Sequence, residues 1–365
     1  MDFNVNGHNI FIIVSVCFLA SLIFVQMMKK VAIFLKILDV PNDPRKIQEH
    51  PVPLLGGLGI FFAFLLGYML FAPKNDLMIA ILIGSFLIML LGLFDDMTKS
   101  ETPMPNKYKV LVQLIVAAIV VFYGGLELTK VTLFGITIKF SSIPFLPELI
   151  SMLIIVATIN AINLIDGLDG LCAGISSIYF LTIAVIGFIL NKFGGLDIIL
   201  SLIMLGSTLG YLVHNFPPAR IYQGDAGSTF LGFMISVIFL LGFKTTTLTS
   251  LIIPLLILAI PIMDTLFAIL RRLINHKPLG EPDKNHLHHQ LLRLRLSQKK
   301  TVLIIYLVDI LFAVASILYA IGNRMLGTNK YGIIIYIILF VLTVILVLKT
   351  NIIWNHDKKD KEDKN

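Results

Sequence analysis

Long apolar runs separated by short polar segments extend along almost the whole chain. About 20 apolar residues in a helix cross the hydrocarbon core of a bilayer, which is about 30 Å thick. Eleven runs reach or nearly reach this length: 10–28, 54–72, 77–94, 109–124, 146–164, 171–190, 196–213, 228–243, 249–270, 302–321 and 332–349. The pattern predicts an all-α polytopic integral membrane protein with about eleven transmembrane helices, forming a single transmembrane domain over 1–349.

The distribution of Lys and Arg between the runs indicates which way the helices cross. Cytosolic loops carry an excess of these residues. With the N-terminus outside and the C-terminus inside, 22 of the 29 Lys and Arg residues fall on the cytosolic side. No Lys or Arg precedes the first run, and Lys29 and Lys30 follow it. We therefore expect an N-out/C-in chain whose first run is a span, not a cleaved signal peptide.

Two polar segments depart from the helical pattern. The outer segment 131–140 alternates apolar and polar residues around Gly135, which predicts a small extracytoplasmic β-hairpin. The segment 350–365 ends in HDKKDKEDKN, a mixed-charge sequence that predicts a disordered cytosolic tail.

The composition supports lipid as the solvent of this chain. Hydrophobic residues make up 57% and charged residues 14%, and the mean hydropathy is +0.91, which excludes an ordinary soluble domain. Cys17 and Cys172 lie in apolar runs without a CxxC pattern, so a disulfide scaffold and a zinc site are excluded. The net charge of +7 fits loops beside anionic lipid, and we expect no nucleic acid partner.

Candidate chemistry is concentrated in four segments that this topology places on the cytosolic face. They are GLFDDMTKS with Asp95 and Asp96, NAINLIDGLDG with Asn160, Asn163, Asp166 and Asp169, YQGDAGS with Asp225, and the histidine segment NHLHH at 285–289. Acids, amides and histidines from four separate loops on one face predict a cytosolic active-site cleft at the membrane surface.

Each segment also has a plainer interpretation. Asp95 and Asp96, with Lys99 and Lys109 nearby, fit either an ion-pair network or a site for phosphate and metal. Polar amides in a span face a cavity or form hydrogen bonds between helices, and DGLDG fits a simple turn. GDAGS fits a turn with a helix cap, and the histidines fit either diphosphate recognition or a basic loop beside anionic lipid. Together, acids for Mg²⁺ and cations for phosphates suit transfer of a phosphorylated group from a nucleotide to a lipid.

The segments, in this order, resemble the polyprenyl-phosphate N-acetylhexosamine-1-phosphate transferase family, also called glycosyltransferase family 4. The resemblance covers about 39–292 and includes DVPNDPRK with PVPLLGG, the DDxxK set, NxxNxxDGxDG, GDxGS and HxHH. The eleven runs, PVPLLGG and HLHH look more like the branch that uses UDP-N-acetylglucosamine than the phospho-N-acetylmuramoyl-pentapeptide transferase branch.

The resemblance implies a Mg²⁺-dependent reaction in the bacterial cell membrane, with Mn²⁺ as a substitute. Undecaprenyl phosphate attacks the sugar-side phosphorus of UDP-N-acetylglucosamine and UMP leaves, giving the lipid-linked sugar that starts a cell-envelope glycan. It also implies a homodimer. The implied catalytic residues are Asp95 (as base), Asp96, Asp166 and Asp225, and the implied metal ligands are Asp225, Asp96 and Asp166. The implied substrate-binding residues are Lys46, Lys99, Lys109, Asn160, Asn163, Asp169, Asn215, Tyr222, His286, His288 and His289.

Two other functions compete with this expectation. A phospho-N-acetylmuramoyl-pentapeptide transferase performs the same chemistry on a larger donor. A secondary transporter belongs to a different class, and it would carry its polar residues near the bilayer midplane on broken helices, with repeated halves. Here the acids lie at predicted helix ends on one face, and the sequence has no 20–50-residue repeat.

Overall fold

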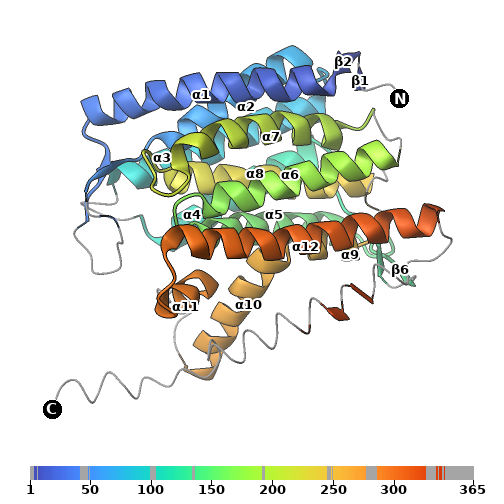
Figure 1. Ribbon diagram of the computed structural model, residues 1–365. Coiled ribbons are helices and arrows are strands. Elements are labelled where there is room, and N and C mark those ends of the chain that lie inside the picture. The colour runs from blue at the N-terminus through green and yellow to red at the C-terminus, as the bar shows by residue number, and fades with distance from the viewer. Residues whose placement is uncertain are drawn as a thin grey trace.

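The computed structural model is a bundle of long helices that run side by side (Figure 1). It describes residues 4–5, 7–41, 48, 50–98, 104–133, 136–190, 194–244, 248, 250–276, 286–325, 334–335, 337–338 and 341. The helices are α1 (Ile10–Phe34), α2 (Gly56–Phe71), α3 (Asp76–Thr98), α4 (Asn106–Ala118), α5 (Leu146–Ile165), α6 (Leu171–Ile189), α7 (Leu196–Asn215), α8 (Gly224–Lys244), α9 (Ile252–Ile257), α10 (Ala259–Ile274), α11 (Leu287–Arg293) and α12 (Gln298–Met325).

Eight helices in the described part of the chain are long and apolar enough to cross a membrane. They are α1, α3, α4 with the π-helical turn Ile119–Tyr123 that continues it, α5, α6, α7, α8 and α12. The predicted run 54–72 forms α2, which is apolar but only 16 residues long. The polytopic membrane fold is therefore confirmed. The run 332–349 lies almost entirely outside the described residues, as does the predicted tail 350–365.

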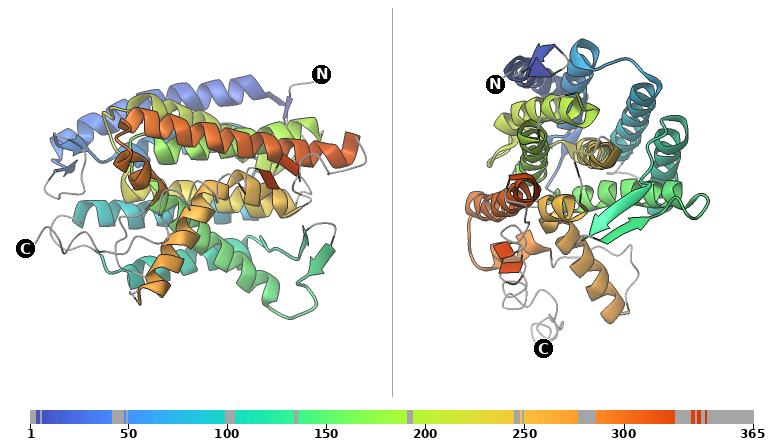
Figure 2. Two further views of the ribbon diagram at one scale, coloured as in Figure 1. Left: turned by 60° about the horizontal axis from the view of Figure 1, so that its bottom comes forward. Right: turned by 90° about the vertical axis from the view of Figure 1, so that its right-hand side faces the viewer.

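The predicted run 249–270 is not one helix, so this prediction was wrong. The chain forms the short helix α9 and then α10, with Leu258 between them. Pro261 explains the break, because proline has no N–H to donate to the carbonyl four residues earlier and its ring clashes there. In Figure 2, α10 leaves the direction of the other helices and runs obliquely beneath the bundle.

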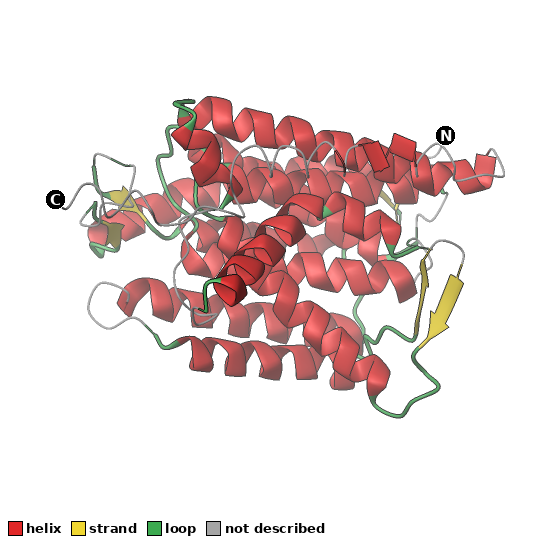
Figure 3. Cartoon of the chain, turned by 90° about the horizontal axis from the view of Figure 1, so that it is seen from below, coloured by secondary structure: helices red, strands yellow, loops and turns green. Residues whose placement is uncertain are grey.

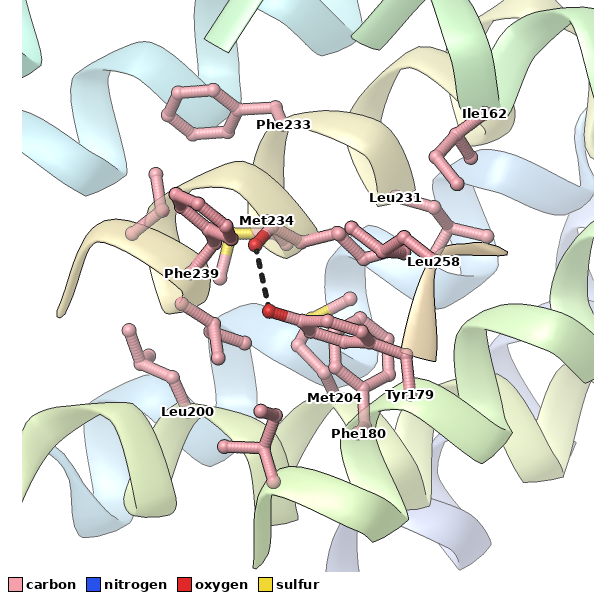
Figure 4. Packing of buried hydrophobic residues seen from close by; sticks show 14 of the residues in the cluster. Ile162, Tyr179, Phe180, Leu200, Met204, Leu231, Phe233, Met234, Phe239 and Leu258 are labelled. Atoms are coloured by element: carbon pink, nitrogen blue, oxygen red, sulfur yellow. Dashed lines mark hydrogen bonds between the residues drawn. The ribbon is translucent and has the colours of Figure 1, made fainter. Parts of the chain in front are cut away.

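The core of the bundle surrounds α8, almost all of whose residues are buried. Figure 4 shows Phe233 and Met234 of α8 among side chains of neighbouring helices. There the hydroxyl group of Tyr179 donates a hydrogen bond to the carbonyl oxygen of Ile235 over 3.3 Å. Since this phenol is fully buried, an unmade hydrogen bond would cost free energy.

Small residues bring α7 close to α1. A Cβ atom added at Gly206 or Gly210 would collide with a backbone oxygen of α1, that of Val14 or Phe18 respectively. This spacing of two glycines four residues apart is typical of close helix pairs in membranes. Other side chains of α1, such as Phe11 and Ile23, are apolar and exposed, which suits contact with lipid.

Three short two-stranded pairings lie at the ends of the bundle (Figure 3). The strands are β1 (Asn4–Val5), β2 (His8–Asn9), β3 (Leu38–Asp39), β4 (Val52–Pro53), β5 (Lys130–Leu133) and β6 (Ile136–Lys139). Antiparallel pairing of β5 with β6 confirms that this segment pairs as two strands, and its extracytoplasmic position stays a prediction. The sequence did not predict β3–β4. Figure 1 shows β6 at the opposite end of the bundle from α11.

Candidate active site

Helix direction brings the predicted acids to one end of the bundle. Asp95 and Asp96 lie in the last turn of α3, Asp166 follows α5, and Asp225 lies in the first turn of α8. The helices α3 and α5 run in the same direction and α8 runs in the opposite one, so these helix ends meet. The structure thus brings together segments up to about 130 residues apart in the chain.

Lys109 joins two of these acids. Its Nζ lies 2.6 Å from Oδ2 of Asp95 and 2.9 Å from Oδ2 of Asp225. The Asp95 side chain is 3% exposed, whereas those of Asp225 and Lys109 are 19% and 24% exposed. One ammonium group therefore bridges two carboxylates, and Asp225 and Lys109 still reach solvent. The structure supports the ion-pair interpretation for Lys109, Asp95 and Asp225, and a site for phosphate and metal here stays a prediction.

Asp96 holds the first turn of α8 in place. Its Oδ1 accepts a hydrogen bond from the backbone N–H of Asp225 (2.8 Å), and its Oδ2 accepts one from the N–H of Ala226 (3.0 Å). A carboxylate is favourable here because the first N–H groups of a helix have no partner within the helix. Asp96 therefore helps to fix the position of Asp225. Its predicted contact with a metal stays a prediction.

Gly224 permits this contact and offers a test of it. Its φ is +67°, and a Cβ atom there would overlap the carboxylate of Asp96. We expect Gly224→Ala to lower the free energy of unfolding of the detergent-purified protein by about 1–3 kcal/mol, because of backbone strain and steric overlap. The melting temperature should fall accordingly. Gly194→Ala is the matched control, because a Cβ atom there meets nothing within 4 Å. Equal melting temperatures for the two variants would contradict the assignment.

A cleft of about 280 Å³ opens beside the network. Its lining comes from five parts of the chain: Asp39, Gln48, Leu54, Asp166, Gly167, Leu168, Asp169, Asn215, Tyr222, Gln223, Gly224, Asp225 and Gln298. Of these, Asp166, Asp169, Asn215, Tyr222 and Asp225 were predicted from sequence. Sequence analysis did not single out Asp39, Gln48, Leu54, Gln223 and Gln298, although Asp39, Leu54 and Gln223 lie within the quoted segments DVPNDPRK, PVPLLGG and YQGDAGS.

The loop after α5 is tied to the loop after α7. Oδ1 of Asn215 accepts a hydrogen bond from the N–H of Gly170 (2.8 Å), and its Nδ2 donates to the carbonyl oxygen of Ile221 (2.9 Å). Oδ2 of Asp169 accepts from the N–H of Ala219 (2.9 Å). Asn215 therefore shapes the cleft wall, and the predicted contacts of Asp169 and Asn215 with uridine stay predictions.

Tyr222 presents an aromatic ring to the same cleft. Its N–H donates to the carbonyl of Pro53 in β4 (2.8 Å), and its own carbonyl accepts from Gly56 (2.8 Å), so the PVPLLGG segment holds it on both sides. Burial and the negative charge of Asp169 raise the pKa of Tyr222, which keeps the phenol neutral at pH 7. A neutral ring in a cleft suits stacking on a flat base.

Asn160 and Asn163 form hydrogen bonds between helices. Nδ2 of Asn160 donates to Oε1 of Gln113 in α4 (2.7 Å), and Nδ2 of Asn163 donates to Oγ of Ser228 in α8 (2.8 Å). Neither residue lines the cleft. The structure thus favours the interhelical interpretation for both, and their predicted contact with substrate stays a prediction.

The histidines reach the loop after α5. A Cβ atom at Gly167 would overlap the ring of His288, so the two residues are in direct contact. Burial, with the charge of His289 as a second cause, lowers the pKa of His288 to about 3, so this ring is neutral at pH 7. The ring of His289 lies 4.2 Å from that of His288, measured between centroids. His288 therefore fits a packing role better than the predicted role of a cation for phosphate.

Two predicted cations, Lys46 and Lys99, lie outside the described residues. Within the described part of the chain no three His, Cys, Asp or Glu side chains are grouped as metal ligands. Mg²⁺ does not need such a group, because it keeps several waters and binds through one or two carboxylates and substrate phosphates. Oδ1 of Asp95 is buried, and it has no hydrogen-bond partner among the residues that the structure describes. Carboxylate oxygens around a position already held by a cation fit a hard divalent ion.

The comparisons with known proteins agree with these motifs. The family model described as "Glycosyl transferase family 4" matches residues 78–243, which include Asp95, Lys109 and Asp225. The chain is 39% identical to a "Probable undecaprenyl-phosphate N-acetylglucosaminyl 1-phosphate transferase" of Bacillus subtilis, over 83% of this chain and 82% of that protein. It is 30% identical to an "Undecaprenyl-phosphate alpha-N-acetylglucosaminyl 1-phosphate transferase" of Haemophilus influenzae, over 90% and 91%. It is also 30% identical to a "Decaprenyl-phosphate N-acetylglucosaminephosphotransferase" of Mycolicibacterium smegmatis, over 72% and 70%. With these relatives aligned along most of its length, and with the acids of its own motifs meeting at one end of a membrane bundle, the chain belongs to glycosyl transferase family 4.

Proposed function

We propose that this chain transfers N-acetylglucosamine 1-phosphate from UDP-N-acetylglucosamine to undecaprenyl phosphate. The names of its relatives in Bacillus subtilis and Haemophilus influenzae specify the sugar phosphate and the lipid carrier. The product is the lipid-linked sugar that begins a cell-envelope glycan, and UMP is released.

The Asp95–Lys109–Asp225 network is the observation that carries the proposal. An oxygen of the lipid phosphate forms a bond to the sugar-side phosphorus of the donor, and the bond from that phosphorus to the bridging oxygen breaks, so UMP leaves with the bonding pair. A phosphate monoester is largely ionised near pH 7 and needs little deprotonation. Phosphoryl transfer depends mainly on positioning and charge neutralisation. Lys109 supplies a cation at the mouth of the cleft, held by two acids.

The two substrates reach this network from different sides. The cleft side, with Tyr222 and Asp169, suits the uridine of the donor, because it combines an aromatic ring with a carboxylate acceptor. The lipid phosphate approaches along the membrane surface toward Asp95 and Lys109, which lie on helices that cross the bilayer. We assign the principal metal contact to Asp225, with Asp166 on the same cleft wall. When bound, Mg²⁺ (or Mn²⁺) offsets the charge of the diphosphate.

We place the cleft on the cytosolic face of the bacterial plasma membrane, with the N-terminus outside. The excess of Lys and Arg at this end supports the orientation. Asn106 and Thr137 are exposed at opposite ends of the bundle, in α4 and β6, and the two native cysteines are buried. We expect a membrane-impermeant maleimide added to intact cells to label Thr137→Cys and to leave Asn106→Cys unlabelled until the cells are opened. Labelling of both variants in intact cells would overturn this orientation.

The proposed reaction is tested by measuring UMP release from purified protein in detergent with undecaprenyl phosphate. UDP-N-acetylglucosamine and UDP-N-acetylmuramoyl-pentapeptide are supplied in separate reactions. We expect release with the first donor only, its loss on adding EDTA, and its return with excess Mg²⁺. Release with the second donor only would transfer the proposal to the muramoyl-pentapeptide reaction. Release with neither donor, beside a control enzyme that consumes the same lipid, would overturn the transferase assignment.

A further inference from the structure

The helix α10 carries a buried acid, Asp264, that has no role in the proposed transfer as described so far. Asp264 is 6% exposed, and both of its carboxylate oxygens accept hydrogen bonds from the segment that begins α11. Oδ2 lies 2.8 Å from Nδ1 of His286, and Oδ1 accepts from the N–H of Leu287 over 2.8 Å. A buried carboxylate is costly without such partners. Both carboxylate oxygens of Asp264 therefore have their hydrogen-bond partners in this one segment.

Ring contacts connect His286, the hydrogen-bond partner of Asp264, to the cleft. The rings of His286 and His288 are parallel within 2°, with centroids 5.8 Å apart. His288 in turn contacts Gly167, which lines the cleft between Asp166 and Leu168. A continuous series of contacts thus leads from α10 through two histidines to the cleft wall.

Packing alone does not explain how this segment is held. The helix α10 packs mainly on α5 and α9, and α11 packs mainly on α12. Figure 1 shows α10 running obliquely away from the bundle, with α11 beside the end of α12. The carboxylate of Asp264 therefore provides a direct polar link between α10 and α11.

We propose that Asp264 is a positioning residue for the transfer reaction. It fixes the ring of His286 by accepting from Nδ1, as carboxylates do for functional histidines elsewhere, and it fixes the first turn of α11 through Leu287. This holds the histidine segment against the loop that carries Asp166 and Asp169, on the donor side of the cleft. The inference rests on the proposed transferase function.

The test compares kinetic constants for both substrates in variants of Asp264 and His286. Asp264→Ala leaves His286 buried without its partner, and we expect the KM for the sugar nucleotide to rise about tenfold, with the KM for the lipid phosphate nearly unchanged. Asp264→Asn keeps an oxygen for the N–H of Leu287 and an amide that donates to Nδ1 of the His286 tautomer whose hydrogen is on Nε2. We expect it to restore the donor KM to within about threefold of the wild type.

A double-mutant cycle separates positioning from general stability. Asp264 acts partly through His286 and partly through Leu287, so adding Asp264→Ala to His286→Ala should raise the donor KM further, but by clearly less than the tenfold expected for Asp264→Ala in the wild type. Additive effects, equal changes in both KM values, or no rescue by Asp264→Asn would overturn the proposal. Asp309→Asn is the matched control for loss of a buried carboxylate, because Asp309 lies fully buried in α12 without a hydrogen-bond partner among the described residues. It should leave both KM values unchanged. Absence of UMP release in the wild type would instead refute the underlying function.

Discussion

Asp225→Asn should reduce UMP release by roughly a thousandfold while the protein remains folded in membranes. Asparagine has nearly the same shape, so the backbone hydrogen bonds from Asp225 and Ala226 to Asp96 persist. The lost negative charge removes one of the two carboxylates around Lys109 and the principal assigned metal contact. Turnover should fall at saturating concentrations of both substrates and should not recover with excess Mg²⁺.

Asp76→Asn is the control for this experiment. Asp76 is also an acid in the first turn of a long helix, but it is exposed and begins α3, the helix that carries Asp95 at its other end. Its activity should equal that of the wild type. Near-normal turnover of Asp225→Asn, at equal protein level and equal melting temperature, would refute the assigned role of Asp225.

Lys109→Met should lower both activity and stability. The methionine fills much of the space of the lysine stem but leaves the carboxylates of Asp95 and Asp225 facing each other without a cation. Because Asp95 is nearly buried, its negative charge then has little water to stabilise it. We expect UMP release to fall by on the order of 100-fold and the melting temperature to drop. Mg²⁺ should recover part of the lost stability, because a divalent cation also neutralises this pair.

Lys107→Met provides the comparison for Lys109. It lies two residues earlier on α4, it is exposed, and its ammonium group lies over the ring of Tyr108. This change should leave the melting temperature and UMP release close to wild-type values, since exposed charges contribute little. If the two methionine variants behave alike, the ion-pair network has no special role in the reaction.

Periodicity and charge were enough to predict the membrane bundle and the meeting of the acids. The positions of Asp95, Asp166 and Asp225 at helix ends follow from the lengths of apolar runs, because a run that crosses the bilayer must place its flanking polar residues at a surface. The family resemblance gave these acids their expected roles. Neither source of information indicated that Asp96 would accept both N–H groups at the start of α8, since that contact depends on tertiary packing.

The differences between the predictions and the structure have physical causes that can be named. The run 249–270 is apolar throughout, and hydropathy alone does not register that Pro261 interrupts the backbone hydrogen bonds. The roles of Asn160 and Asn163 were ambiguous, because a polar amide in a membrane span can form hydrogen bonds either with a ligand or with a neighbouring helix. Gln113 and Ser228, which accept the hydrogen bonds of these amides, lie on other helices, 47 and 65 residues away in the sequence. The sequence likewise gave no sign that Gln298, at the start of α12, would reach the cleft.

The two hydrogen bonds that Asp96 accepts from the first turn of α8 have a consequence for how the protein assembles in the membrane. Asp96, on α3, is synthesised more than a hundred residues before its partners Asp225 and Ala226. Because helices enter the membrane in chain order, Asp96 remains without these two backbone donors until α8 arrives. The reaction centre is thus completed late in biogenesis, and a chain cut short before Gly224 would be a membrane protein that lacks the groups needed to complete its own site.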